Sequence, residues 1–504
     1  MPAHTEDHVE KLHDVQDPVR ESSEVETTGE EDERTSLIHN EGKSRLWPPP
    51  VRRYVPVEPV AFGFLCCIVM TLPLIQFYMY DKIAEGYGGV NKTTTDPCSP
   101  GADNSSDAKL EKKIQSEAAD YNIFLIFTST FPGIFQTILL GSLSDRYGRK
   151  LSMLLPLCGL LLKLIVYLIV FELDLPLGYL FIGCAVEGFS GGFGTMLTAI
   201  FGCAADITPV GPKRGFRMAV IQAVMSFGSA LGSLVAGIWI EEANFKQPLY
   251  FLIALSGATL LFTIFIFPET RRNLPEGSLA VKEHLKLLKR SVQFYTKDTP
   301  DKRRWKLIVS LMTFFTSFSV DLIKATVLTL YLLATPFCWS KIQITSYSAA
   351  RTIINWICIL GLTHILLRRF SEVTIAIIGC VSNLLFLVLI GTAQSSVLVI
   401  VAAAFGVFSE AAPAMMRSVM SKLVSPDEQG ALFASVSTME MAAASVFGVV
   451  ATLIYKASLS FFPGLIFVIL AGLIFLTVLM LGALSYSLKK SSSQRSKTIT
   501  VTVD

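Results

Sequence analysis

Apolar segments of about 20 residues or more recur along most of the chain, and short polar stretches separate them. A helix needs about 20 mostly apolar residues to cross a bilayer. Helices are the expected spanning structure because the backbone must satisfy its own hydrogen bonds in lipid. The pattern therefore predicts an all-α membrane protein with twelve transmembrane helices. Their predicted ranges are 58–80, 120–141, 150–171, 176–201, 216–239, 248–267, 306–333, 343–366, 372–391, 396–418, 430–454 and 463–487.

A long polar interval at 268–304 divides the predicted helices six and six. We therefore expect an N-terminal six-helix bundle at 55–267, a cytoplasmic linker at 268–304 and a C-terminal six-helix bundle at 305–488. The first 50 residues hold 13 acidic and 5 basic residues and almost no aromatic ones. Such a composition buries too little apolar surface to fold. Residues 1–54 are thus predicted to be a disordered acidic tail, and residues 489–504 a second, short tail.

The composition agrees with a membrane protein and excludes several other classes. Hydrophobic residues make up 51% of the chain and charged residues 17%, against about 25% charged residues in soluble domains. A nucleic-acid binder would need a basic stripe on a polar scaffold, and nine cysteines in 504 residues are too sparse for a disulfide scaffold. The chain has no nucleophile elbow, P-loop or metal-ligand spacing, so no enzyme activity, cofactor or metal is expected.

Lysine and arginine gather in alternate loops, and this asymmetry orients the predicted helices. Ten of them lie in the interval 268–304, and basic pairs precede the first helix at 52–53 and follow the last helix at 489–490. Because basic loops stay on the cytoplasmic side, we expect both termini there.

The long loop at 81–119 is predicted to lie on the opposite face of the membrane. It contains the two N-x-S/T sequons of the chain, at Asn91 and Asn104, and such sequons accept N-glycans in exported segments. Cys98 and Cys338 lie in predicted loops on this face. Because oxidising compartments allow disulfides, we expect a disulfide between them and glycosylation of the asparagines.

A ten-residue motif, G-S-L-S-D-R-Y-G-R-K at 141–150, lies between the second and third predicted helices. It resembles the signature loop of the major facilitator superfamily at every fixed position. Asp145 is expected close to the N-terminus of the third helix, where a negative charge is favourable, and Gly148 gives a tight turn its backbone freedom. The resemblance implies the major facilitator fold and a conformational gate at Gly141, Asp145, Arg146, Gly148 and Arg149.

A narrower resemblance covers residues 55–490. The strings that carry it lie at 205–219, 335–339 and 417–433. They are similar to the proton-coupled folate transporter family, solute carrier family 46, which implies a proton-coupled symporter of folates or other small organic anions and a luminal disulfide at the two loop cysteines. The chain departs from the family where Gln222 replaces a proton-coupling glutamate and Asp321 replaces a histidine. Asp206 and Gln222 are carried over as candidates for substrate or proton binding.

Ionisable residues near the bilayer centre cost roughly 2.5–3.5 kcal/mol each on insertion scales, so each one indicates a role. Asp321 and Lys324 lie three apart on one helix, close enough to pair. One interpretation is a purely structural ion pair. The other is functional: Asp321 accepts a proton while Lys324 is released to bind an anionic substrate. Arg351 is the first candidate for an anion clamp because guanidinium binds carboxylate bidentately. Arg417 either does similar work or anchors its helix at the cytoplasmic end.

Three glutamates in predicted helices are candidate proton carriers, since a carboxylate in an apolar site takes up protons more readily: Glu187, Glu410 and Glu440. Each also has a purely structural interpretation. Lys163 is expected to snorkel or to pair. Only His364 of the six histidines falls in a predicted helix, near its cytoplasmic end, so a histidine relay in the membrane is not expected.

The acidic tail carries one short motif, E-R-T-S-L-I at 33–38. Glu33, Leu37 and Ile38 match the acidic dileucine sorting pattern D/E-x-x-x-L-L/I. In a cytoplasmic tail this pattern would be read by a clathrin adaptor, which favours a lysosomal or endosomal membrane. The plasma membrane remains the competing location.

Together these observations predict a secondary active transporter of a small organic anion, folate-like or other, that works by alternating access and is coupled to protons. Its expected partners are the lipid bilayer, the anion and the adaptor, with no nucleic acid. One alternative is a facilitative transporter without a proton, which Gln222 favours. The other is a non-transporting membrane receptor, against which the costly charges Asp321, Lys324 and Arg351 argue.

Overall fold

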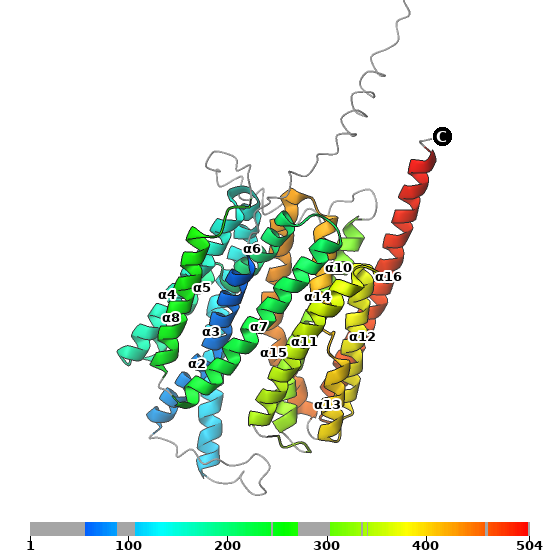
Figure 1. Cartoon of the computed structure of the whole chain (residues 1–504). Helices are drawn as coiled ribbons and strands as arrows, with labels where there is room; N and C mark the ends of the chain where they lie inside the picture. The colour runs from blue at the N-terminus through cyan, green and yellow to red at the C-terminus, as the bar shows by residue number, and fades with distance from the viewer. Residues whose placement is uncertain are drawn as a thin grey trace, which may run out of the picture. The chain divides into compact units, whose positions relative to one another are not determined.

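The structure is a computed structural model. It describes residues 56–87, 106–242, 245–270, 303–333, 336–339, 341–458 and 462–501, and every regular element in these residues is a helix (Figure 1). By its contacts the chain separates into two units, Met1–Arg52 and Arg53–Asp504, and all described residues belong to the second. The predicted tail at 1–54 and nearly all of the linker at 268–304 lie outside the described residues.

The helices before the linker cover the first six predicted ranges. The first of them begins with Glu58 followed by Pro59, a start that favours a helix because proline presets φ and lacks the N–H that has no partner in the first turn. The elements are α2 (Glu58–Gly86), α3 (Ser106–Tyr147), α4 (Arg149–Glu172), the short 3-10 helix η2 (Leu177–Tyr179), α5 (Leu180–Phe189), α6 (Gly192–Ile207), α7 (Pro212–Glu242) and α8 (Lys246–Phe265).

The helices after the linker cover the remaining six ranges. Ser371 caps the helix that follows it, because its hydroxyl accepts a hydrogen bond from the backbone N–H of Thr374 at 3.3 Å. The elements are α10 (Arg303–Leu333), α11 (Lys341–Leu366), α12 (Glu372–Gly391), α13 (Ser396–Phe405), α14 (Ala411–Leu423), the 3-10 helix η4 (Pro426–Glu428), α15 (Gln429–Ser458) and α16 (Leu465–Val501).

Helix occupies most of each predicted range, with breaks at 190–191 and 406–410. The length and hydropathy expected of a membrane span are met by ten stretches of the described residues. The predicted span 396–418 is divided into α13 and α14, and α15 is not among the ten. Pro413 lies in the first turn of α14, where proline is tolerated because the N–H it lacks would have no partner within the helix. The chain turns at 406–410.

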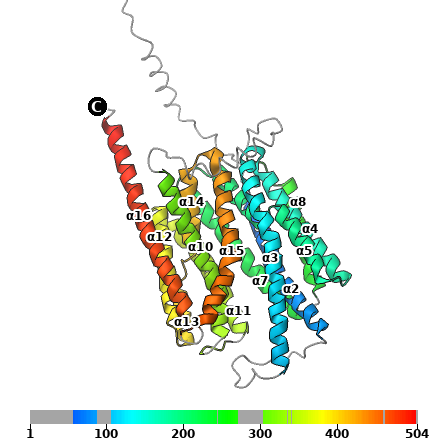
Figure 2. The same ribbon diagram turned by 180° about the vertical axis from the view of Figure 1, so that it is seen from behind.

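Two hydrophobic cores organise the helices. One core is built from residues 57–267 together with Phe433, and the other from residues 307–484 together with Ala219. We call α2–α8 the first helix group and α10–α16 the second helix group. Figures 1 and 2 show the members of each group side by side. The groups meet where α3 and α6 pack on α15 and where α7 packs on α11 and α14.

Large apolar side chains also cover the outside of the helices. Phe265 is 79% exposed, Val397 70% and Phe131 66%, and many leucines and isoleucines accompany them. A water-soluble monomer exposes such residues singly and seldom over the length of most of its helices. This surface suits a lipid environment, in agreement with the hydrophobic pattern of the sequence.

Candidate functional site

The predicted gate motif forms the junction between α3 and α4. Gly148 separates the two helices with a φ of 102°, a conformation that residues with a Cβ rarely adopt. A Cβ at this position would also collide with the carboxylate of Glu269. The predicted tight turn at Gly148 is therefore confirmed, and glycine is required there by both conformation and space.

Asp145 binds the N-terminus of a different helix from the predicted one. Its carboxylate accepts backbone hydrogen bonds from Gly430 at 2.9 and 3.0 Å and from Ala431 at 3.2 Å, in the first turn of α15. The N-terminus of α4 is satisfied by Glu269, which accepts from the backbone N–H groups of Arg149 and Lys150. The sequence-based placement of Asp145 at the third predicted helix is thus corrected, because Glu269 already occupies that position.

Arg149 links the residues around the predicted gate motif from inside the protein. Its side chain is fully buried, its Nη2 lies 2.6 Å from Asp145 and its Nε lies 2.8 Å from Asp206. Asp206, predicted as a substrate or proton residue, therefore lies in the gate. We define Asp145, Arg149, Asp206 and Glu269 as the gate cluster. The side chain of Arg146 lies outside the described residues.

The gate cluster joins the two helix groups, since α3 belongs to the first and α15 to the second. Gly141 allows the close approach: a Cβ on it would collide with Ala434 and lie 3.1 Å from the carbonyl oxygen of Gly430. A second contact lies at the same end of the helices, where buried Arg214 in α7 donates to the hydroxyl of Ser421 in α14 at 3.0 Å. In this conformation the two groups are joined at the end of the helices that carries the gate motif.

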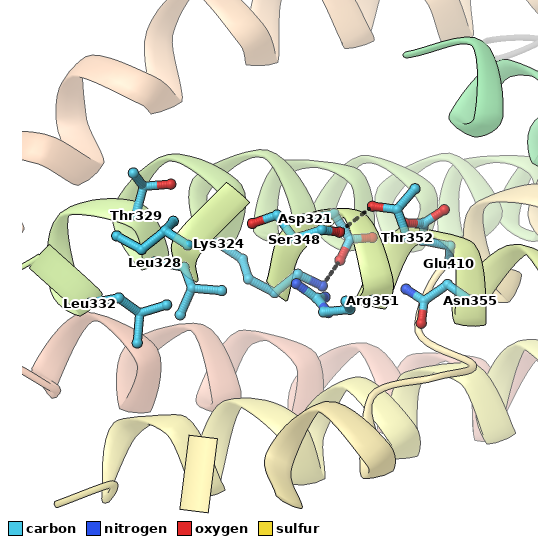
Figure 3. Close-up of a pocket in the computed structure, with 11 residues that line it drawn as sticks. Asp321, Lys324, Leu328, Thr329, Leu332, Ser348, Arg351, Thr352, Asn355 and Glu410 are labelled. Carbon is cyan, nitrogen blue, oxygen red and sulfur yellow. Dashed lines mark hydrogen bonds and ion pairs between the residues drawn. The ribbon is translucent and has the colours of Figure 1, made fainter. Parts of the chain in front are cut away.

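A pocket of about 190 Å³ opens in the second helix group. We call it the charged pocket. Figure 3 shows Arg351, Asn355 and Glu410 toward one end of the pocket and Leu328 and Leu332, with Thr329, toward the other. The lining residues are Asp321, Lys324, Leu328, Thr329, Leu332, Ile344, Ser348, Arg351, Thr352, Asn355 and Glu410.

Asp321 and Lys324 form the ion pair that their spacing predicts. Lys324 Nζ lies 2.5 Å from Asp321 Oδ1 and 3.1 Å from Asn383 Oδ1, while Asn383 Nδ2 donates to Asp321 at 3.1 Å. The amide of Asn383, on α12, therefore fixes both members of the pair. Sequence reasoning missed Asn383, although a lone asparagine inside the apolar run 372–391 is a signal that could have identified it.

Arg351 is the cation of the charged pocket that has no acidic partner among the described residues. Its guanidinium lies 4.4 Å from the ring centroid of Phe386, a cation–π contact, and its Nε has no hydrogen-bond partner there. The side-chain oxygen of Asn355 is also buried without a partner in this part of the chain. A guanidinium whose buried Nε has an unused N–H can bind an oxyanion strongly because the hydrogen bond is charge-assisted.

Glu410 lies toward the same end of the charged pocket as Arg351 and Asn355. It immediately precedes α14, and its Oε2 accepts a hydrogen bond from the hydroxyl of Ser226 at 3.1 Å. Ser226 belongs to α7, so this bond crosses from the second helix group to the first. Both groups of helices therefore contribute to the surroundings of the pocket.

Arg417 is buried among the helices, which excludes the interpretation that it anchors its helix at the membrane surface. It is 2% exposed and its guanidinium lies between the rings of Phe201 and Phe314. Nη1 donates to Gln222 Oε1 at 2.7 Å and Nη2 pairs with the carboxylate of Glu440. Gln222 and Glu440, both predicted as candidates, thus meet at this arginine and form what we call the Arg417 cluster.

The other predicted residues lie away from the charged pocket. Glu187 pairs with Lys163 at 2.6 Å between α5 and α4, which confirms that Lys163 is paired. His364 contacts Arg368 and the ring of Phe216. No group of three or more His, Cys, Asp or Glu residues that could hold a metal occurs within the described ranges.

The remaining predictions concern loops and the tail. Cys338 is disulfide-bonded, and the seven cysteines within the helices are free. Cys98, the predicted partner of Cys338, lies outside the described residues. So do the sequon residues and the sorting motif, namely Asn91, Asn104, Glu33, Leu37 and Ile38.

Comparison with known proteins shows what this arrangement resembles. A sequence profile of the Major Facilitator Superfamily matches residues 110–332, which include the gate motif. The chain is similar to the major facilitator superfamily over this range. It is 29% identical to the proton-coupled folate transporter of Rattus norvegicus, over 85% of this chain and 92% of that protein.

Two further similarities agree with this resemblance. The chain is 28% identical to the lysosomal proton-coupled steroid conjugate and bile acid symporter SLC46A3 of Gallus gallus, over 84% of this chain and 92% of that protein. Among solved structures, the human organic anion transporter MFSD10 superposes with a TM-score of 0.65 at 18% identity, covering 86% of this chain and 100% of that one. The proton:xylose symporter XylE superposes with a TM-score of 0.57 at 15% identity, covering 84% and 95%. The chain is thus a multi-pass membrane protein with the fold of these transporters.

Proposed function

We propose that this protein is a secondary active transporter that moves a small organic anion together with protons by alternating access. The observation that carries the proposal is Arg351, a cation in the charged pocket that has no acidic partner among the described residues. The relatives named above are proton-coupled transporters of folate and of steroid conjugates and bile acids, all of which are organic anions. An amphipathic pocket that contains an arginine without an acidic partner among the described residues suits a substrate of this class.

The proposal includes the complete architecture of twelve membrane helices in two six-helix bundles. Ten membrane-length stretches are present in the described residues. The pair α13–α14 would bring the number of membrane helices to eleven and α15 would bring it to twelve. The two hydrophobic cores support a division into two bodies that rock against each other. In this conformation the gate cluster and the Arg214–Ser421 bond hold the bodies together at the gate end. Breaking these contacts would separate the bodies at the gate end and open the pocket to that side of the membrane.

A facilitative transporter is the second candidate, and Gln222 is the observation that favours it. Gln222 accepts a hydrogen bond from Arg417 and stays neutral at every physiological pH. A protein that relied on this position alone for its proton would be uncoupled.

Proton coupling can be tested by transport into proteoliposomes. A one-unit pH gradient stores about 1.4 kcal/mol per proton, which supports about tenfold accumulation at one proton per anion. We therefore expect an acidic exterior to drive accumulation of at least one of three radiolabelled probes: a folate, a bile-acid conjugate or a steroid sulfate. An uncoupler should abolish the accumulation, and protein-free liposomes should show none. Uptake that the uncoupler leaves unchanged would favour the facilitative alternative.

We also propose that both termini lie in the cytoplasm and that the protein resides in a lysosomal or endosomal membrane. The plasma membrane is the alternative location. The proposal also includes the Cys98–Cys338 disulfide and glycans on Asn91 and Asn104. Basic residues flank the first and last predicted helices, and one of the relatives is lysosomal by name. An adaptor that reads the dileucine motif would supply the sorting step.

Replacing Leu37 and Ile38 together with alanine should move the protein to the plasma membrane, because the motif loses both of its apolar anchors. Cell-surface biotinylation measures the change. The matched control replaces Thr35 and Ser36, which lie inside the motif at positions that are not fixed. An unchanged distribution of the Leu37 and Ile38 variant would show that the motif is not the sorting signal.

A further inference from the structure

The charged pocket contains two carboxylates in different surroundings. The charge of Asp321 is matched by Lys324, 2.5 Å away, and both are held by the amide of Asn383. Asp321 is therefore one half of a hydrogen-bonded ion pair.

Glu410 has no such partner. Its Oε2 accepts from the hydroxyl of Ser226 at 3.1 Å, and in the part of the chain that the structure describes no cation lies within ion-pairing distance of it. A hydroxyl is a neutral donor, so it orients the carboxylate without matching its charge. Glu410 is thus free to change its protonation state without breaking an ion pair.

Near the pocket, the other charges on the helices around Glu410 are already paired, and Arg214 on α7 lies at the gate end, where it donates to Ser421. The helices that pack on α14 are α7, α10, α12 and α15. Their neighbouring charges, and those on α14 itself, form the pairs Lys324–Asp321, Arg417–Glu440 and Lys422–Glu372. Arg351, on α11, lines the same pocket and keeps an unused donor. Glu410 and Arg351 are therefore the two unpaired charges of the pocket.

The balance of formal charges in the pocket couples binding of an anion to binding of a proton. The four charged residues of the empty pocket are two acids and two bases, so their formal charges cancel. An anion bound to Arg351 leaves one negative charge in excess, and a proton on Glu410 removes it. Because unmatched charge is unfavourable in a site with little water, each ligand strengthens binding of the other, by linkage on the order of tenfold.

We propose that Glu410 carries the proton that accompanies the organic anion, and that Ser226 is the positioning residue that holds its carboxylate. The carboxylate takes a proton from the side to which the pocket is open and releases it on the other side after the anion has left. Ser226 lies in the first helix group and Glu410 in the second, so the bond between them responds to rocking of the two bodies. This inference rests on the proposed transport function.

Two assays on reconstituted protein separate the coupling step from substrate binding. The first measures proton-driven accumulation of the probe that the wild-type protein transports. The second measures counterflow, the exchange of labelled for unlabelled probe without a proton gradient, which does not require a proton to leave the carrier. For Glu410→Gln we expect accumulation to fall about tenfold or more, the full linkage, while counterflow stays within about twofold of wild type.

Ser226→Ala provides a readout that a structural role would not change. Loss of the hydroxyl removes a hydrogen bond that favours the ionised carboxylate, so accumulation should persist but reach half its maximum at a higher pH. The matched control is Ser229→Ala on the same helix, because the hydroxyl of Ser229 bonds only to the backbone of its own helix, at Met225. Its pH profile should coincide with that of the wild type.

Each outcome decides between the alternatives. Wild-type protein that transports none of the probes would overturn the proposed function and this inference with it. Coupled wild-type transport together with coupled transport by Glu410→Gln would overturn this inference alone, and so would a joint loss of accumulation and counterflow in a variant of normal abundance. If Glu410→Gln is not produced in folded form, the pH profile of Ser226→Ala decides, and an unshifted profile would overturn the inference.

Discussion

Replacing Arg417 with methionine should lower the free energy of unfolding by about 3–5 kcal/mol, the range for breaking a buried ion pair. The substitution leaves the carboxylate of Glu440, which is 1% exposed, without its cation. It also removes the guanidinium from between the rings of Phe201 and Phe314. Thermal or denaturant unfolding of the purified protein in detergent measures the loss.

A double variant shows whether the loss comes from the stranded carboxylate. Arg417→Met combined with Glu440→Met removes both charges, and apolar replacement of a buried pair is often neutral for stability. We therefore expect the double variant to recover most of the loss. Lys246→Met is the control, because the Lys246–Glu172 pair is about 38% exposed at both ends and such pairs contribute at most about 1 kcal/mol. Equal losses in the single and double variants would contradict the role assigned to the pair.

Replacing Arg351 with alanine should reduce anion uptake about 30-fold or more, since removing one partner of a buried charged contact typically costs 2 kcal/mol or more of binding. Arg351 is the cation of the charged pocket that has no acidic partner among the described residues, so its removal should not strand a buried carboxylate. Abundance and thermal stability should therefore stay near wild type. Uptake at substrate concentrations below saturation measures the effect.

Two comparisons make the Arg351 result specific. Arg368→Ala removes an exposed arginine that follows the same helix and contacts His364, and it should leave uptake unchanged. Arg351→Lys keeps the charge but loses the planar fork that grips a carboxylate, so its uptake should be intermediate. Normal uptake by Arg351→Ala would remove this residue from the site.

The gate shows how far local reasoning reaches. The turn at Gly148 follows from a short motif because a positive φ and a crowded neighbour are properties of a few adjacent residues. The partner of Asp145 does not follow, since Gly430 is 285 residues away along the chain. Both the N-terminus of α4 and that of α15 suit a carboxylate, and only the packing of the helices decides that Glu269 binds the first and Asp145 the second.

The candidate site shows the same division. The Asp321–Lys324 pair is predictable because residues three apart share a helix face. The partners of Arg417 come from α7 and α15. From the sequence alone, this arginine could either bind the substrate anion or anchor its helix at the membrane surface. The sequence also gives no way to distinguish the three single acids in apolar runs, which are Glu187, Glu410 and Glu440. The tertiary structure separates them, because it gives cations to two and a hydroxyl to the third.

The sequence by itself determined the helical class, the approximate position of most helices, the gate motif and the candidate charged residues. These properties depend on hydrophobic runs and short spacings, which a chain carries regardless of how its helices pack. The tertiary structure alone decided which charges pair, which remain available in a common pocket and which contacts join the two helix groups. Those outcomes depend on residues far apart along the chain, whose meeting is set by the summed packing of all the helices rather than by any local pattern.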